Sequence, residues 1–234
     1  MKIGIIGAMS VEVEMLKDMM ENVKVEKISQ IDFYCGNLFG NDVIVAVSGV
    51  GKVNSAICTQ TMILKYSPAA IINTGVAGGI SNEISIGDLV IATAVVQHDM
   101  DSSPLGDPKG LISGINMIDI PCANYLVELL KKASESIENT NIFTGIIATG
   151  DQFINSNEEV NRISDEFSAI ATEMEGGSIG HVCYVNGVDF CVVRSISDGG
   201  DNLSNMDFVE FLDLAVKKSI ELMTNFLKLV SKYE

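Results

Sequence analysis

Short and almost purely apolar runs alternate along this chain with longer segments whose apolar positions recur every three or four residues. The first pattern is typical of buried strands and the second of amphipathic helices. Strands are predicted at residues 2–7, 43–48, 70–74, 88–97, 143–149, 169–172 and 190–196. Helices are predicted at residues 12–21, 53–66, 124–136, 157–164, 177–186 and 208–233. Continuous apolar strands between helices indicate an α/β protein with a largely parallel sheet that is covered on both faces.

The least regular stretch of the chain is residues 100–121, which holds three of the four prolines and several glycines. It is too short for a linker between domains, so we expect a loop or flap beside a site. With 234 residues and 47% hydrophobic content, the chain is predicted to form a single domain, residues 1–234, with a full core.

The chain is strongly acidic, with a net charge of −16, and it has only two arginines, Arg162 and Arg194. Nucleic-acid binding needs clustered Lys and Arg, so the charge excludes that class of partner. No apolar run approaches the ~20 residues that span a bilayer. Glu12 and Glu14 would interrupt the apolar core of a signal peptide. We therefore expect a cytoplasmic protein with no membrane partner.

The cysteines and histidines form no metal-binding pattern. The five cysteines are odd in number, lie in apolar contexts and include no CxxC pair. This usage is typical of buried thiols in a reducing cytosol. His98 and His181 are far apart and neither belongs to a paired ligand motif, so no zinc site is predicted.

Three segments that contain acids each follow a predicted strand, at residues 7–12, 172–177 and 194–199. In an α/β sheet such strand ends converge on one crevice, where ligands bind. Their carboxylates are therefore expected to face a single pocket, either to move protons or to steady a cation.

The glycine clusters do not match a phosphate-binding loop. Gly4 and Gly7 have the spacing GxxG and lack the GxGxxG pattern of a dinucleotide fold, and no glycine lies five residues before Gly51 as a Walker A loop requires. These glycines instead favour tight strand-to-helix turns and a close backbone approach to an uncharged ligand.

Six short motifs occur in order along nearly the whole chain, at residues 4–9, 48–53, 73–79, 150–154, 173–175 and 194–198. Together they resemble the 5′-methylthioadenosine/S-adenosylhomocysteine nucleosidases of the purine nucleoside phosphorylase superfamily. The resemblance implies a three-layer α/β/α domain around a mixed sheet, usually as a homodimer. It also implies hydrolysis of adenine from thio-ribosides without a metal or an organic cofactor.

The residue types suit this chemistry. Cleavage of an N-glycosidic bond to adenine passes through a transition state with oxocarbenium character. It needs an acid at N7, a base for the attacking water and anionic groups near the ribose. By resemblance, Asp198 is the acid, Glu12 is the base and Glu175 holds the ribose hydroxyls.

The resemblance also assigns the other substrate-binding residues. Phe153 is expected to stack on the purine, the Met174 backbone to lie beside Glu175, and Arg194 to orient the acids. Glu173 either faces solvent, holds Arg194 or contacts the substrate. The remaining residues expected at the site are Met9, Val50, Val76, Ala77, Gly78, Leu105, Ile154, Ser197 and Phe208.

Two departures from the commonest family pattern leave the 5′-substituent of the substrate open. Val76 stands where many members have serine, and residues 102–107 lack the aromatic side chains of well-known members. In the family this loop forms part of the substituent pocket, partly across the dimer interface, and Leu105 keeps its apolar character. Methylthio, homocysteinyl, 5′-deoxy and aminofutalosine-type nucleosides all fit the sequence.

Two other functions use the same fold. A phosphorolytic purine nucleoside phosphorylase would need several arginines near the sugar, and the chain has only two. A catalytically silent nucleoside-binding protein would be expected to have lost one of the acids Glu12, Glu175 and Asp198, and all of them are present.

Overall fold

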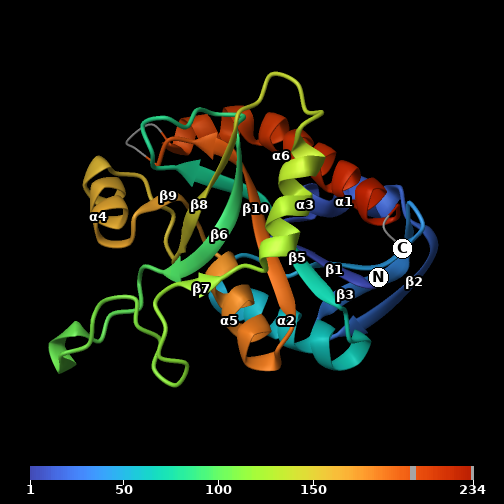
Figure 1. The fold of residues 1–234 in the computed structure, drawn as a ribbon, viewed down its shortest axis with the longest axis horizontal. Coiled ribbons are helices and arrows are strands. Elements are labelled where there is room, and N and C mark those ends of the chain that lie inside the picture. The colour runs from blue at the N-terminus through green and yellow to red at the C-terminus, as the bar shows by residue number, and fades with distance from the viewer. Residues whose placement is uncertain (201–203, 233–234) are drawn as a thin grey trace.

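The computed structural model describes residues 1–200 and 204–232, and within them ten strands form one mixed sheet (Figure 1). The strands are β1 (Ile3–Gly7), β2 (Glu21–Ile28), β3 (Ile31–Leu38), β4 (Asn41–Val47), β5 (Ala70–Gly79), β6 (Leu89–Gln97), β7 (Ile120–Pro121), β8 (Ile142–Thr149), β9 (Ala169–Glu173) and β10 (Asp189–Asp198). The predicted α/β class with a central mixed sheet is confirmed.

The sheet is mixed: β4, β1, β5 and β10 pair in parallel, as do β6, β8 and β9, and the other pairs are antiparallel. β1 pairs in parallel with β4 and β5, and β5 pairs in parallel with β10. β2, β3 and β4 extend one side as an antiparallel meander. On the other side, β10 pairs with β6, β6 with β8, β8 with β9, and β9 with β5. These pairings close five strands into a ring, which brings the ends of β5, β9 and β10 together.

Helices lie on both faces of the sheet (Figure 1). They are α1 (Ser10–Asp18), α2 (Lys52–Tyr66), α3 (Asn124–Ser134), α4 (Asn157–Phe167), α5 (Gly176–Asn186) and α6 (Ser204–Val230). Helices α1 and α3 contact α6 to form one layer, and α2 contacts α5 to form the other. Helix α4 stands apart, against β8 and β9. The described helices thus form the outer layers of the expected three-layer arrangement.

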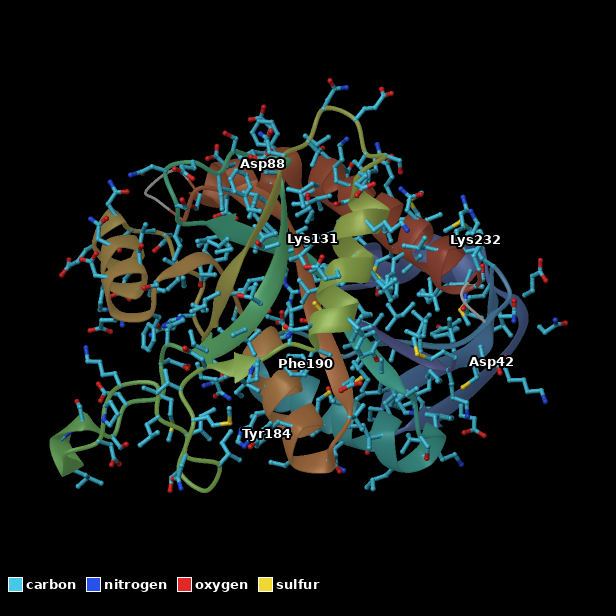
Figure 2. All side chains as sticks on the ribbon, viewed as in Figure 1. Asp42, Asp88, Lys131, Tyr184, Phe190 and Lys232 are labelled. Atoms are coloured by element: carbon cyan, nitrogen blue, oxygen red, sulfur yellow. The ribbon has the colours of Figure 1, made fainter. Side chains whose placement is uncertain are left out.

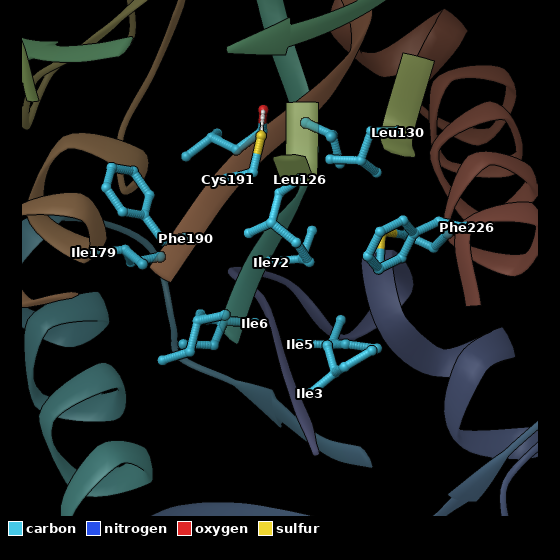
Figure 3. Packing of buried hydrophobic residues seen from close by; sticks show 14 of the residues in the cluster. Ile3, Ile5, Ile6, Ile72, Leu126, Leu130, Ile179, Phe190, Cys191 and Phe226 are labelled. Atoms are coloured by element: carbon cyan, nitrogen blue, oxygen red, sulfur yellow. Dashed lines mark hydrogen bonds between the residues drawn. The ribbon is translucent and has the colours of Figure 1, made fainter. Parts of the chain in front are cut away.

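The core lies between the sheet and the helix layers. Figure 3 shows Ile3, Ile5 and Ile6 of β1 among the side chains that fill it. Every residue of β1 is buried because the strand lies between two other parallel strands and is covered on both faces. Charged side chains such as Asp42, Lys131 and Lys232 project outward (Figure 2).

Two predicted ends were wrong, and the strands β2, β3 and β7 were not predicted. The helix predicted at 12–21 ends at Asp18, and residue 21 begins β2, an edge strand that the sequence analysis missed. Most residues of β2 are exposed on both faces of the strand. The strand therefore lacks the alternation of apolar and polar residues that burial of one face would produce. The strand predicted at 70–74 continues through the glycines to residue 79, because these glycines pair with β9 and β10.

Other boundaries changed by a few residues. Helix α4 extends three residues beyond its predicted end, to Phe167. Helix α6 begins at Ser204, and residue 233, its predicted end, lies outside the described residues. Residues 100–121 are largely irregular as expected, with the short 3-10 helix η1 (Ser103–Leu105) and the short strand β7. No helix in residues 1–200 and 204–232 is long and apolar enough to cross a membrane.

Candidate functional site

A cavity of about 180 Å³ opens at the carboxyl ends of β1, β5 and β10, which run parallel to one another. Most of the predicted site residues line it, namely Met9, Glu12, Val50, Val76, Ala77, Gly78, Phe153, Glu173, Met174, Glu175, Ser197, Asp198 and Phe208. The structure therefore brings together residues from all three acidic segments, as expected for strand ends that meet at one crevice.

Glu12 lies in the first turn of α1 and points back to the end of β1. Its Oε2 accepts hydrogen bonds from the backbone N–H groups of Ala8 and Met9, at 2.7 and 2.8 Å. Its Oε1 accepts one from the N–H of Val76 at 3.2 Å. Burial raises the pKa of Glu12, while Arg194 and these N–H groups act in the opposite direction. The carboxylate is thus fixed in place and only 3% exposed.

Gly75 makes room for the Glu12 carboxylate. A Cβ atom at this position would lie 2.5 Å from Oε1 of Glu12. The backbone conformation of Gly75 is one that other residues can also adopt, since its φ is not positive. The glycine is therefore required by the close approach of an acid to the backbone of β5.

Asp198 ends β10 on the opposite side of the cavity. Its Oδ2 accepts a hydrogen bond from Ser197 Oγ at 2.9 Å, and its Oδ1 accepts one from the N–H of Gly200 at 3.0 Å. Burial raises the pKa of Asp198 against the effect of these donors. A buried carboxyl group with a raised pKa is suited to carry a proton near neutral pH.

Glu175 and Glu173 lie on either side of Met174 at the start of α5, but they have different partners. Oε1 of Glu175 accepts a hydrogen bond from the N–H of Gly51 at 2.8 Å. Burial, and then the negative charge of Glu173, raise the pKa of Glu175 to about 7. The two carboxylates therefore lie in different hydrogen-bonding environments.

Glu173 holds Arg194. Its Oε2 accepts hydrogen bonds from the Arg194 guanidinium and from the N–H of Gly176, the latter at 2.7 Å. Its Oε1 accepts one from the hydroxyl of Thr149. Arg194 also donates to Asn73 and is fully buried behind the acids, so it does not line the cavity. Of the alternatives open for Glu173, the structure favours the one in which it holds the arginine.

Aromatic side chains form the outer wall of the cavity. The rings of Phe153 and Phe208 meet edge to face, with centroids 5.8 Å apart and planes at 85°. Phe153 is 43% exposed and lines the cavity, so its side chain is accessible to a ligand. Ile154, which was expected beside it, lines a smaller adjoining cavity of about 40 Å³.

Leu105 is the predicted site residue that lies away from the cavity. It stands in η1 and is 86% exposed. Two further residues, Ala8 and Thr172, line the cavity although they were not predicted. Ala8 directly precedes Met9 after β1, and Thr172 directly precedes Glu173 at the end of β9. Their position next to predicted site residues could have identified them in the sequence.

No Lys, Arg or His side chain of the described residues lines the cavity. Lys52, which lies nearby, forms a 2.6 Å ion pair with Asp99. Arg162 pairs with Glu159 and Glu166 on the surface of α4. Within residues 1–200 and 204–232, no group of three or more His, Cys, Asp or Glu side chains is arranged to hold a metal ion.

The comparison with known proteins agrees with this geometry. The profile of the phosphorylase superfamily matches residues 2–228. A 5′-methylthioadenosine/S-adenosylhomocysteine nucleosidase of Shewanella halifaxensis is 42% identical over 229 residues, which cover 97% of this chain and 99% of the relative. The chain belongs to this nucleosidase family. The resemblance that the six motifs indicated is therefore confirmed.

Two solved structures have closely similar folds. The family member from Neisseria meningitidis, in complex with methylthio-immucillin-A, has a TM-score of 0.94 and 34% identity, and the match covers 97% of this chain and 98% of that one. Futalosine hydrolase of Helicobacter pylori has a TM-score of 0.91 and 36% identity, with 96% of each chain covered. Nucleosidases of this family thus share one fold with a hydrolase named for another nucleoside.

Proposed function

We propose that this protein hydrolyses the N-glycosidic bond of 5′-methylthioadenosine and S-adenosylhomocysteine and releases adenine. The observation that carries the proposal is the meeting of three buried acids, Glu12, Glu175 and Asp198, around one cavity. The relatives that carry the nucleosidase name support the same reaction.

In the proposed reaction the bond between C1′ of the ribose and N9 of adenine breaks, and its electron pair leaves with the purine. Asp198 donates its proton to N7, so adenine leaves as a neutral molecule. The raised pKa of Asp198, caused by burial, favours the protonated form that this step requires. The hydrogen bonds from Ser197 and Gly200 fix the carboxyl group for the transfer.

Water then forms the new bond to C1′, and Glu12 accepts its proton. Three backbone N–H groups orient the Glu12 carboxylate and support its ionised form. Glu175 binds the ribose hydroxyls, and its negative charge stabilises the oxocarbenium character of the sugar. Phe153 stacks on the purine, with Phe208 at its edge.

The described residues favour hydrolysis over phosphorolysis. A phosphate dianion would need cationic groups beside the ribose. The arginines are engaged elsewhere, Arg194 with Glu173 and Arg162 on α4. Glu12 would also repel a phosphate at the position from which the nucleophile attacks.

The enzyme is also proposed to act as a cytoplasmic homodimer of single-domain chains. Leu105 is largely exposed and remote from the cavity of its own chain, which suits a residue that completes the substituent pocket of a partner subunit. The five cysteines are free thiols, in keeping with a reducing compartment.

The test is adenine release from 5′-methylthioadenosine in phosphate-free buffer and again with phosphate, with the sugar product identified. We expect free methylthioribose at a rate that phosphate does not change. A phosphate requirement with a sugar phosphate product would show a phosphorylase instead. No release would lead to assays with S-adenosylhomocysteine, 5′-deoxyadenosine and aminofutalosine, and inactivity with all of these would indicate a silent binding protein.

A further inference from the structure

Asp99 lies where three segments meet near the cavity. It follows β6 at the base of residues 100–121, whose 3-10 helix η1 extends away from the body of the domain (Figure 1). Its Oδ1 accepts a hydrogen bond from Nζ of Lys52 at 2.6 Å, and its Oδ2 accepts one from the backbone N–H of Asp151 at 3.0 Å. One carboxylate therefore joins the start of α2 to the loop that follows β8.

Asp151 completes the connection. Its Oδ1 accepts a hydrogen bond from the backbone N–H of Lys52 at 2.8 Å. This bond satisfies an N–H of the first turn of α2, whose N-cap residue, Gly51, has no side chain that could do so. A Cβ at Gly51 would lie 2.9 Å from the same Oδ1. Lys52, Asp99 and Asp151 thus form a closed ring of three hydrogen bonds.

Each of the two loops that this ring joins contributes a residue to the cavity wall. Val50 lies two residues before Lys52, Phe153 lies two residues after Asp151, and both line the cavity. The side chains of Lys52 and Asp99 are only 19% and 20% exposed, so their charge-assisted hydrogen bond is less weakened by water than a surface pair. The ring therefore fixes the position of the Phe153 loop relative to Val50.

We propose that Lys52 and Asp99 are positioning residues for the purine, holding the Phe153 loop against the Val50 loop at the spacing that the base requires. This inference rests on the proposed function, because the purine is the proposed ligand of Phe153. Neither positioning residue lines the cavity. Among the described residues, the side chains of Lys52 and Asp99 make no hydrogen bond to Glu12, Glu175 or Asp198; the bond that Glu175 accepts comes from the backbone N–H of Gly51, the residue before Lys52. Loosening the ring should therefore weaken purine binding more than it slows bond cleavage.

The experiment measures adenine affinity by calorimetry, and KM and kcat for 5′-methylthioadenosine, in Asp99→Asn and Lys52→Met. Each variant should raise KM and the adenine Kd about tenfold, because a hydrogen bond to a charged group is lost. The kcat should fall by less than about threefold. As a matched control, Glu128→Gln and Lys131→Met remove an exposed ion pair on α3 and should leave all three constants unchanged.

Asp99→Asn is also made in a protein that already carries Phe153→Ala. This double variant tests whether Asp99 affects purine binding through the Phe153 loop or in some other way. If Asp99 acts through the Phe153 loop, Asp99→Asn should change KM by less than about twofold in that background. An equal increase of KM in both backgrounds, an unchanged KM, or a loss confined to kcat would each overturn the proposal.

Folding of the variants is checked by circular dichroism. If Asp99→Asn does not fold, Lys52→Met provides the same test, because it leaves both bonds of Asp151 in place. Unfolding of both variants would show a structural role and would also overturn the proposal. A wild-type protein that neither binds adenine nor hydrolyses the nucleoside would refute the proposed function itself, before any variant is compared.

Discussion

The guanidinium of Arg194 forms its ion pair with Glu173 and stays 3.9 Å from Oε2 of Glu175. Arg194 is the one fully buried Lys or Arg side chain among the described residues, and its guanidinium donates hydrogen bonds to Glu173, Asn73 and the carbonyl of Val193 rather than to Glu175. Glu175 then keeps a pKa raised to about 7, first by burial and second by the charge of Glu173.

This arrangement predicts a strong stability effect for Arg194→Met. The substitution leaves Glu173 buried without its cation, which should cost about 3–5 kcal/mol of unfolding free energy. Urea denaturation at pH 7.5 measures the loss. Adding Glu173→Gln should recover part of it, because the uncompensated charge is then removed. An unchanged denaturation midpoint in Arg194→Met would show that the ion pair is not structural.

The raised pKa of Glu175 predicts a pH dependence of stability. An acid whose pKa is higher in the folded than in the unfolded protein contributes stability below its unfolded pKa, and this is lost as pH rises through its folded pKa. The ordinary pKa of a glutamic acid side chain is 4.5, and the pKa of Glu175 in the folded protein is about 7. Between pH 5 and 8, wild type should therefore lose roughly 2–3 kcal/mol relative to Glu175→Gln. Parallel stability curves for the two proteins would contradict the shift.

Glu12→Gln tests water activation. The amide keeps the size of the side chain but cannot accept a proton, so kcat should fall by about 10²–10⁴-fold while a non-hydrolysable substrate analogue binds normally. Calorimetry and single-turnover assays separate binding from chemistry. Glu14→Gln, an exposed acid on the same helix, is the matched control. Near-full turnover in Glu12→Gln would assign the base to another group.

Asp198→Asn tests the proton donor. The variant should retain the fold and lose about 10²–10⁴-fold in kcat on adenine nucleosides, since an amide does not protonate N7. The same substitution at Asp189, the exposed residue at the other end of β10, should leave kcat unchanged. Turnover of Asp198→Asn at the wild-type rate would place the acid elsewhere.

The sequence located this site because its chemistry lies at strand ends. Buried apolar runs such as β1 and β10 are unambiguous in the sequence, and the acids Glu12 and Asp198 lie immediately beyond or at their ends. The parallel pairing of the strands then brings these acids together at one edge of the sheet. The edge strand β2 was missed because an exposed strand has no hydrophobic pattern to mark it.

Contacts between side chains and distant backbone could not be predicted in the same way. The sequence analysis ended a strand before the glycines that begin at Gly75, but they continue β5, and the reason for Gly75 is the carboxylate of Glu12, 63 positions earlier. The ring formed by Lys52, Asp99 and Asp151 likewise joins three distant segments. Such contacts form only when distant segments pack together, so neither the composition nor the local periodicity of the sequence predicts them.

Gly75→Ala therefore gives a prediction that only the structure supplies. The new methyl group would lie 2.5 Å from Oε1 and 2.9 Å from Cδ of Glu12, so the carboxylate must move away from Val76 and from the position at which we propose that it activates water. Because a 1 Å displacement of a reacting group can cost about 10²-fold, kcat should fall by about that factor. The backbone conformation accepts alanine, so the loss should not arise from strain in β5.

Gly145→Ala is the control for Gly75→Ala, because it also adds a methyl group to a strand glycine. There the three nearest atoms all belong to the side chain of Ile170, whose flexible outer end lies 2.7 Å away, and neither residue lines the cavity. We expect this control to keep its kcat. If Gly75→Ala also keeps its kcat, catalysis does not depend on the position of the Glu12 carboxylate next to Gly75. The assignment of Glu12 as the base would then have to change.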